Sequence, residues 1–304
     1  MSGLRDDPLW PYLAEIIACT EAEGIILAGG FGLRLKQHYL NTLKSADGDI
    51  HISLLAELPE ARATPDLDLF LNVNIWVDIE KAHALSAALR NPLNYESVLH
   101  SWHFRKPLAG LPERFVKLDL LARQPLVNEP VKVKGNPKQV GREMGTGIAG
   151  RFTPEAFAID DTPLLLKFDD AGQQYSILVP HPYSWLNMKV RAAYDWIRER
   201  KGLIEPKLTS EGDAIRLKHV YDVYVLTAML TQEELIQAAS LAKKYTDHEE
   251  AIKTRKQAVE LYGRVDAEGT QAIKAYSRRF MGTDLTIDYD LFWTEGLQVV
   301  LGID

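Results

Sequence analysis

The stretch DLDLFLNVNIWV (residues 66–77) is the most strand-like segment of the chain, and it carries two aspartates one residue apart. Side chains of a β-strand alternate between its two faces, so Asp66 and Asp68 are expected to point the same way. Leu67 and Leu69 would then point to the opposite, apolar face. Two carboxylates on one face repel each other unless a cation lies between them. The stretch therefore predicts a strand of a sheet and, on its polar face, a candidate cation site.

A third aspartate occurs in a similar setting further along the chain. Asp119 lies within RFVKLDLLA (residues 114–122), an apolar strand in which an acid is costly unless it is paired. If the two strands are neighbours, three carboxylates form an all-oxygen site, which suits magnesium or manganese better than zinc. The simpler alternative, solvated carboxylates at the end of a strand, stays open.

Upstream of these strands, IILAGG (residues 25–30) is expected to be a short buried strand that runs into two glycines and then a helix. The backbone N–H groups at Gly29 and Gly30 and the N-terminus of the helix favour binding of a phosphate. A glycine pair by itself also fits a tight turn. Phe31, the next residue, has Leu35 one helical turn further on and on the same face. We therefore expect Phe31 to pack into the core, with a contact to a base or ribose as the alternative.

The composition is that of a soluble protein with a core: 46% hydrophobic residues, 25% charged residues and a net charge of −7. A single cysteine, Cys19, excludes an internal disulfide and fits a reducing compartment. The first residues, MSGLRDDPLWPY, do not read as a secretory signal, and no stretch reaches the roughly 18 apolar residues of a membrane span. We therefore expect a cytoplasmic protein with no membrane partner, in which contact with a nucleic acid needs a local basic patch.

Periodicity and turn residues predict the order of the secondary structure. Strands come first and helices later, which indicates an α+β fold with a domain boundary near residue 182. The expected domains are residues 1–182, with a mixed sheet, and residues 183–304, which are helical. Residues 131–151 are rich in glycine and basic residues and contain a single acid, Glu143, so they predict a mobile, locally positive loop or an ordinary solvated connection. The predicted helices are 8–22, 31–44, 79–90, 184–201, 212–230, 232–246 and 248–280, and the predicted strands are 25–30, 66–77, 95–106, 114–122, 164–168 and 175–179.

Two charged residues lie within the apolar faces of predicted helices. Lys189 falls four residues after Trp185 and four before Ala193, and Asp222 falls in the apolar series of residues 212–230. An isolated charge on a core face is unfavourable, whereas a paired charge is tolerated. A Lys189–Asp222 bridge between neighbouring helices is one interpretation. In the other, which is compatible with it, Lys189 binds substrate phosphates and Asp222 orients it.

Taken in chain order, these motifs carry a resemblance to a known family. The order is Gly29–Gly30, then Arg62-x-Thr64-x-Asp66-Leu-Asp68-Leu, then KLD at 117–119, then Lys189 and KHVYDVYVL with Asp222. Over roughly residues 10–230 the chain resembles the AbiEii-like branch of the DNA polymerase β-type nucleotidyltransferases, which occur in type IV toxin–antitoxin and phage-resistance systems. Phe31 stands where the superfamily usually has serine or threonine.

The resemblance implies a mixed-sheet nucleotidyltransferase domain followed by a helical C-terminal part. It implies an enzyme that moves a nucleoside monophosphate from a nucleoside triphosphate to RNA, including tRNA ends, or to a protein hydroxyl, in a toxin or phage-defence setting with a cognate antitoxin as partner. The cofactor would be Mg²⁺ or Mn²⁺. The metal ligands would be Asp66, Asp68 and Asp119; Lys189 and Asp222 would complete the catalytic residues; and the nucleotide would contact Gly29, Gly30, Phe31, Arg62, Thr64 and Lys189.

Two other functions stay open. LAGGFGLRL (residues 27–35) also looks like the N-terminal motif of nucleotide-sugar pyrophosphorylases, although that motif normally opens the chain and is followed by a loop that bears proline and lysine. The second alternative is a catalytically silent protein of the same fold that binds a nucleotide or a partner protein.

Overall fold

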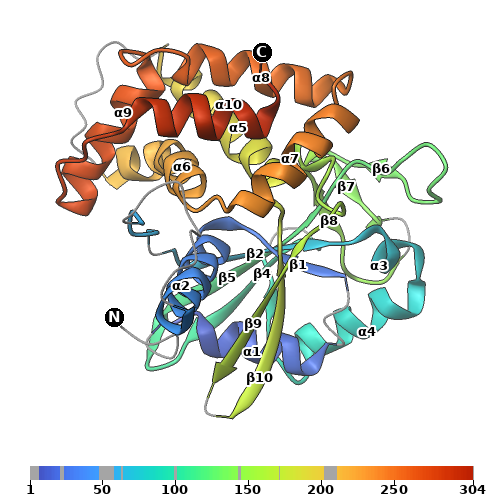
Figure 1. Cartoon of the computed structure of the whole chain (residues 1–304). Helices are drawn as coiled ribbons and strands as arrows, with labels where there is room; N and C mark the ends of the chain where they lie inside the picture. Colours follow the sequence, from blue (N-terminus) through green and yellow to red (C-terminus); the bar gives the residue numbers. More distant parts are fainter. Residues whose placement is uncertain are drawn as a thin grey trace. The chain divides into compact units, whose positions relative to one another are not determined.

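The computed structural model describes residues 7–20, 24–47, 58–62, 64–98, 101–142, 145–170, 172–201 and 211–303. Within these ranges it describes the backbone but not the side chains of residues 44–47, 170, 199–201 and 211–216. The chain divides into two compact units (Figure 1). Unit 1 comprises Met1–Tyr39 and Ala63–Pro180, and unit 2 comprises Leu40–Arg62 and His181–Asp304. The sequence placed one boundary near residue 182; in the structure unit 2 begins at His181 and also takes in residues 40–62.

Unit 1 is built on one mixed sheet. The strand order is β6-β7-β8-β5-β2-β1-β10-β9, and β4 pairs with β5 and carries β3 at its outer edge. The pairs β1–β10, β2–β5 and β5–β8 are parallel, and the other pairs are antiparallel. The described strands are β1 Ile25–Leu27, β2 Asp66–Leu71, β3 Glu96–Ser97, β4 His103–Leu108, β5 Leu111–Ala122, β6 Val133–Lys134, β7 Gln139–Val140, β8 Gly150–Phe152, β9 Leu164–Asp170 and β10 Gln173–Val179.

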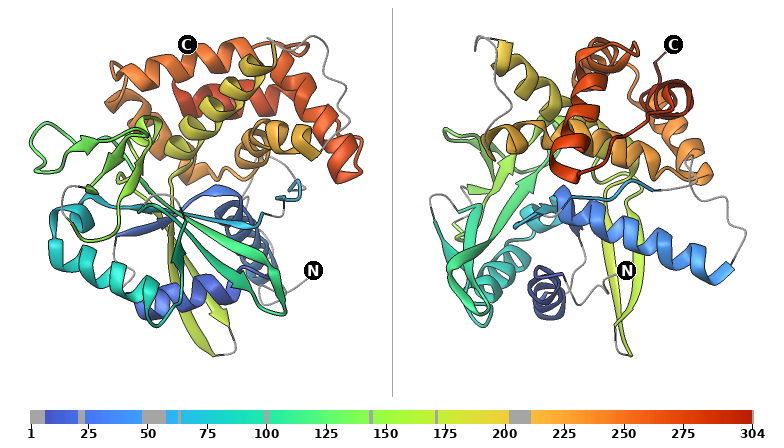
Figure 2. Two further views of the ribbon diagram at one scale, coloured as in Figure 1. Left: turned by 180° about the vertical axis from the view of Figure 1, so that it is seen from behind. Right: turned by 90° about the vertical axis from the view of Figure 1, so that its left-hand side faces the viewer.

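The predicted hairpin of residues 164–168 and 175–179 is confirmed, because β9 and β10 pair in continuous antiparallel register from Leu164 with Val179 to Asp170 with Gln173. Figure 2 shows this hairpin as a twisted two-stranded ribbon that extends beyond its neighbouring strands. The predicted pairing of residues 95–106 with 114–122 is also confirmed, as β4 with β5.

Two expectations about unit 1 are wrong. The strand expected over residues 66–77 ends at Leu71, and a helix, α3 (Val73–Val77), follows because the Asn72 side chain accepts a hydrogen bond from the backbone N–H of Asn74 at 2.9 Å. Residues 131–151 are not all loop. They contain β6, β7 and the start of β8, whose backbone pairing the glycine-rich composition did not reveal.

The other helices of unit 1 match their predicted positions closely. They are α1 (Trp10–Cys19), α2 (Gly29–Asp47, which continues into unit 2) and α4 (Ile79–Arg90). Phe31 is 1% exposed and Leu35 is fully buried, so the predicted packing of Phe31 into the core is confirmed. A ring buried to this degree offers no surface to a base or ribose.

Unit 2 is helical in its described part. Its helices are α5 (Pro182–Lys201), α6 (Glu211–Ala228), α7 (Gln232–Lys244), α8 (Glu249–Tyr262), α9 (Glu268–Tyr276) and α10 (Gln298–Leu301), with π-helical segments at Ser277–Met281 and Asp290–Leu297. The single helix expected over residues 248–280 is wrong: α8 ends at Tyr262, where Gly263 caps it by donating to the Val259 carbonyl. No helix in the described ranges is both long and apolar enough to cross a membrane.

Candidate functional site

The three aspartates singled out in the sequence lie on one face of the sheet of unit 1. β2 and β5 are parallel neighbours, with Asp66 opposite Lys117 and Asp68 opposite Asp119. Residues paired across a ladder project to the same face, and so do residues two apart on one strand. The expectation that the two strands are adjacent is therefore confirmed. All three carboxylates are partly exposed, whereas the intervening leucines on the other face are buried.

Gly29 brings the start of α2 against this face. The backbone pairing of β1 with β2 extends to Ala28, whose N–H donates to the Asp68 carbonyl at 2.8 Å. Gly29 follows with φ +67°, and a Cβ there would lie 1.9 Å from the Asp68 Oδ2. The Asp68 carboxylate therefore occupies the space that a side chain at position 29 would fill. A glycine is required both for the left-handed backbone and for this close approach. Gly30 is buried in the first turn of the same helix.

The Asp66 carboxylate has an oxygen that the described protein does not satisfy. Its Oδ1 is buried and has no hydrogen-bond partner. The backbone N–H of Asp66 donates to the Thr64 Oγ1 at 3.3 Å, so Thr64 lies at the entrance to the strand. Buried polar atoms are nearly always satisfied, and a carboxylate oxygen without a donor is the kind of atom that a cation satisfies.

Asp119 has a neighbour that sequence reasoning missed. His103 of β4 pairs with Asp119 across the antiparallel ladder, and its Nδ1 is hydrogen-bonded to the Asp119 Oδ1. The sequence predicted that these strands pair, but it could not place His103 opposite Asp119 because the register shifts at Pro107 and Leu108. Asp119 therefore lies between Asp68 on one side and His103 on the other.

The chemistry of these donors suits a hard divalent cation. The donors that Asp66, Asp68 and Asp119 supply are all oxygen, as Mg²⁺ and Mn²⁺ prefer, and one of them is the buried, unsatisfied Asp66 Oδ1. In the side-chain positions observed, no three histidine, cysteine or acidic side chains among the described residues converge closely enough to hold a metal ion. The Asp119 carboxylate is directed to His103, and that of Asp68 lies against Gly29.

A second group of candidate residues lies in unit 2. The Asp222 carboxylate accepts two hydrogen bonds from Arg62, Nε to Oδ1 at 2.8 Å and Nη2 to Oδ2 at 3.0 Å. It accepts a third from the Lys189 Nζ at 2.7 Å. The exposed fractions of these side chains are 1% for Asp222, 7% for Lys189 and 10% for Arg62. The predicted bridge between α5 and α6 is thus present, and Arg62, assigned from the sequence to nucleotide binding, is its third member.

Electrostatics in this cluster favour an anion. Burial by itself would raise the pKa of Asp222, but the charges of Lys189 and Arg62 outweigh it and hold that pKa well below its usual range. His219 lies 3.8 Å from the Asp222 Oδ2, too far for a hydrogen bond, and burial together with Lys189 lowers its pKa well below 6.5. His219 is therefore neutral near pH 7. Two cations, Arg62 and Lys189, thus bind the one carboxylate of Asp222.

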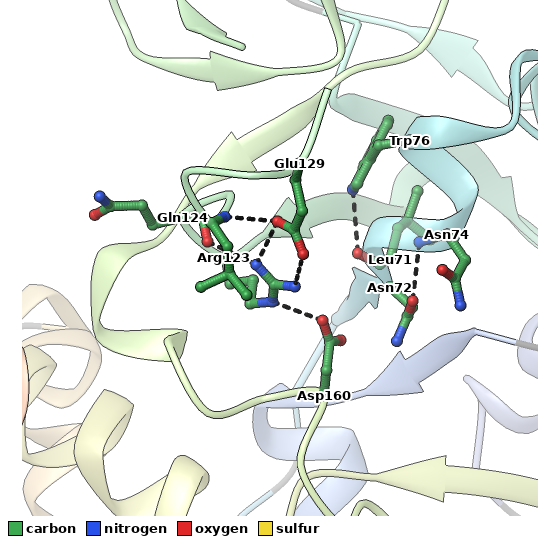
Figure 3. A network of polar contacts seen from close by, with 9 residues as sticks. Leu71, Asn72, Asn74, Trp76, Arg123, Gln124, Glu129 and Asp160 are labelled. Carbon is green, nitrogen blue, oxygen red and sulfur yellow. Dashed lines mark hydrogen bonds and ion pairs between the residues drawn. The ribbon is translucent and has the colours of Figure 1, made fainter. Parts of the chain in front are cut away.

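A third charged network, drawn in Figure 3, is structural. Arg123, directly after β5, donates to the Asp160 Oδ2 at 2.6 Å and to both carboxylate oxygens of Glu129 at 2.9 and 2.6 Å. Glu129 also accepts from the backbone N–H of Leu126, so the network fixes the turn of residues 124–129. Arg123 thereby ties this turn to Asp160, and the network has no role in the candidate site.

Comparison with known proteins adds no identification, since no protein-family model, curated protein or solved structure matches the chain. The function has therefore to be inferred from the residues and their geometry. Of the residues predicted from the sequence, the structure brings together Gly29, Asp66, Asp68 and Asp119 in unit 1, with Gly30 and Thr64 beside them, and Arg62, Lys189 and Asp222 in unit 2.

Proposed function

We propose that this protein is a metal-dependent nucleotidyltransferase that moves a nucleoside monophosphate from a nucleoside triphosphate to an acceptor hydroxyl. One observation carries the proposal. The register of β2 and β5 sets Asp66, Asp68 and Asp119 on one face, and the Asp68 carboxylate lies against Gly29 at the start of a helix. A helix N-terminus favours phosphate, and three nearby carboxylates favour the divalent cations that accompany a triphosphate.

Each residue has a role that follows from its position. Asp66, Asp68 and Asp119 would hold Mg²⁺ or Mn²⁺, which when bound neutralises charge on the phosphates and lowers the pKa of the acceptor hydroxyl. Gly29 and Gly30 would bind the triphosphate through backbone N–H groups. In the transfer, the acceptor oxygen forms a bond to the α-phosphorus, the bond from that phosphorus to the bridging oxygen breaks, pyrophosphate leaves with the electron pair, and the acceptor proton passes to solvent.

The bidentate pairing of Arg62 with Asp222 supports a phosphate-binding role for Lys189. Asp222 and Arg62 form a complete bidentate pair, so Lys189 is the cation whose charge is least compensated. Phe31 has no part in this scheme beyond packing. Neighbouring backbone N–H groups take the place of the hydroxyl that related enzymes carry at that position.

The biological setting is also a proposal, supported by the order of the motifs. The acceptor would be RNA, including a tRNA end, or a protein hydroxyl. The protein would act in the cytoplasm as a toxin or phage-defence enzyme, and an antitoxin protein would restrain it. The pyrophosphorylase alternative is not favoured, because residues 29–47 form an uninterrupted helix where that family has a loop with proline and lysine.

One observation favours a silent, nucleotide-binding protein as the second candidate. The Asp119 carboxylate is already hydrogen-bonded to His103, so it must turn away from His103 to serve as a metal ligand. The two candidates differ in turnover but agree on triphosphate binding.

The test is incubation with each labelled nucleoside triphosphate, Mg²⁺ or Mn²⁺, and total RNA, with Asp68→Asn as the inactive variant. Glu113→Gln, an exposed acid on β5 six residues before Asp119, is the matched control. We expect label transfer by the wild type and by Glu113→Gln and none by Asp68→Asn. Triphosphate binding without transfer would establish the silent alternative, and transfer by Asp68→Asn at the wild-type rate would overturn the mechanism.

A further inference from the structure

Two arginines flank Asp119 on the carboxylate face of unit 1. Arg151 of β8 pairs with Leu121, two residues after Asp119 on β5, and Arg105 of β4 pairs with Lys117, two residues before it. Residues paired across a ladder, and residues two apart on one strand, share a face. Arg105, Lys117 and Arg151 therefore lie on the same face as the three aspartates. We call these three basic residues the basic strip.

Each arginine of the basic strip is backed by an aromatic ring. The Arg105 guanidinium carbon lies 4.7 Å from the centroid of the Phe115 ring, and that of Arg151 lies 5.6 Å from the centroid of a Trp102 ring. Arg151 is exposed and Trp102 is partly buried, so solvent reaches the Arg151 guanidinium. A guanidinium plane is a surface on which an unpaired nucleobase stacks.

Apart from the three aspartates on the same face, one acid among the described residues pairs with the basic strip. Arg105 faces Glu96 at 3.4 Å, but both side chains are exposed, at 44% and 69%, so this pair is weak. Among the described residues, Lys117 and Arg151 make no ion pair, and both side chains are exposed. From Lys117 to the level of Arg151 is four residues along β5, about 13 Å at the usual rise per residue. The strip is long enough to contact more than one phosphate.

The strip lies on the side of Asp119 that an acceptor must use. β5 has β2, with Asp68 and the start of α2, on one side, and it has β4 and β8, with the two arginines, on the other. In phosphoryl transfer the attacking and leaving oxygens are roughly in line on opposite sides of the phosphorus. If pyrophosphate leaves toward Gly29, the acceptor approaches from the side of β4 and β8.

We propose that the basic strip is the acceptor site and that the acceptor is a single-stranded nucleic-acid end, with phosphates on Arg105, Lys117 and Arg151 and a base stacked on Arg151. This inference rests on the proposed function and adds the class of acceptor to it. Repeated positive charge and guanidinium planes backed by aromatic rings match the alternating phosphates and bases of a nucleic-acid strand. A protein hydroxyl as acceptor would not require either feature.

The test is fluorescence anisotropy of a labelled single-stranded RNA of 12 nucleotides, titrated with the full-length protein at several salt concentrations. The variants are Arg105→Gln, Lys117→Gln and Arg151→Gln, and the control is Lys134→Gln on β6, an exposed basic residue outside the strip. We expect each strip variant to bind RNA about three- to tenfold more weakly and to reduce the salt slope by about 0.7, as for the loss of one phosphate contact with a single strand. Arg151→Lys keeps the charge but loses the plane, so it should keep the slope and lose affinity.

Binding of a non-hydrolysable triphosphate, measured by calorimetry on the same variants, separates this inference from the proposed function. We expect triphosphate affinity to be unchanged in Arg105→Gln and Arg151→Gln, because β4 and β8 lie on the side of β5 away from Gly29. Lys117 is opposite Asp66 in the ladder, so Lys117→Gln is used for RNA binding alone. Equal RNA binding by strip variants and control would overturn the acceptor site while leaving the proposed function intact. Loss of binding to an acidic peptide of the same charge, with RNA binding unchanged, would also overturn it and identify a protein-binding surface instead.

Discussion

Removal of the Asp222 carboxylate is expected to destabilise unit 2 far more than removal of either of its cationic partners. Asp222→Asn keeps the size of the side chain but removes the buried carboxylate that Lys189 and Arg62 both bind. Breaking a buried ion pair by removing one partner typically costs about 3–5 kcal/mol, and the loss of a carboxylate that binds two cations places this case at the upper end. For a unit of this size, that loss lowers the melting temperature by roughly 2–4 °C per kcal/mol, or about 10–20 °C.

Lys189→Met is expected to cost much less. It leaves the bidentate Arg62–Asp222 pair intact, with its hydrogen bonds of 2.8 and 3.0 Å. The lost hydrogen bond to a charged group is worth about 1.5–3 kcal/mol, and relief from burying an ammonium group offsets part of it. We therefore expect a net cost below about 2 kcal/mol.

Differential scanning calorimetry of the wild type, both single variants and the double variant Lys189→Met with Asp222→Leu measures the difference. From the sequence alone, this double variant should recover the stability that either single change loses, since the pair is replaced by apolar groups. The structure predicts incomplete recovery, because Arg62 then has lost its carboxylate, and full recovery only when Arg62→Met is added. If the double variant melts at the wild-type temperature, or if Lys189→Met costs as much as Asp222→Asn, the energetic roles assigned to the three-membered cluster are wrong.

Three further outcomes are expected. The folded-state pKa of Asp222 is depressed, so its contribution to stability is complete above the unfolded pKa of about 3.9 and is lost as the pH falls toward the lower folded value. The melting temperature of the wild type should therefore fall below about pH 4, and this loss should be absent in Asp222→Asn. Gly29→Ala places a Cβ 1.9 Å from the Asp68 Oδ2, so it should displace that carboxylate. The affinity for Mn²⁺, measured by electron paramagnetic resonance, should fall at least tenfold, which is about 1.4 kcal/mol. An unchanged affinity for Mn²⁺ would exclude Asp68 as a ligand. Phe31→Ser should lower the free energy of unfolding, measured by urea titration, by about 3–5 kcal/mol, as for other buried phenylalanines. Calorimetry should show triphosphate binding that is only modestly tighter. Loss of triphosphate binding by a folded Phe31→Ser protein would show that the ring contacts the nucleotide.

Local features of the chain were readable from the sequence because their causes are local. The alternation of side chains along a strand places Asp66 and Asp68 on one face whatever the strand pairs with. The β9–β10 hairpin follows from two apolar runs around a polar turn. Phe31 and Leu35 share a face because they are one helical turn apart, and both are buried. Where local signals competed, sequence reasoning failed, as at Asn72, whose side chain caps α3 and ends a strand that the apolar pattern continued.

The make-up of the candidate site depended on tertiary structure. The alignment of Asp119 with Asp68 is a property of parallel register, and the position of His103 opposite Asp119 depends on an irregularity at Pro107 and Leu108 that no period in the sequence marks. Arg62 reads as part of the segment before β2, yet its partner is Asp222, 160 residues further along the chain. An ion pair over that separation forms only once helices have packed and removed both groups from water, because burial makes an uncompensated charge too costly to leave alone. The sequence by itself therefore determined which residues are chemically capable, and the packing of distant segments decided which of them meet.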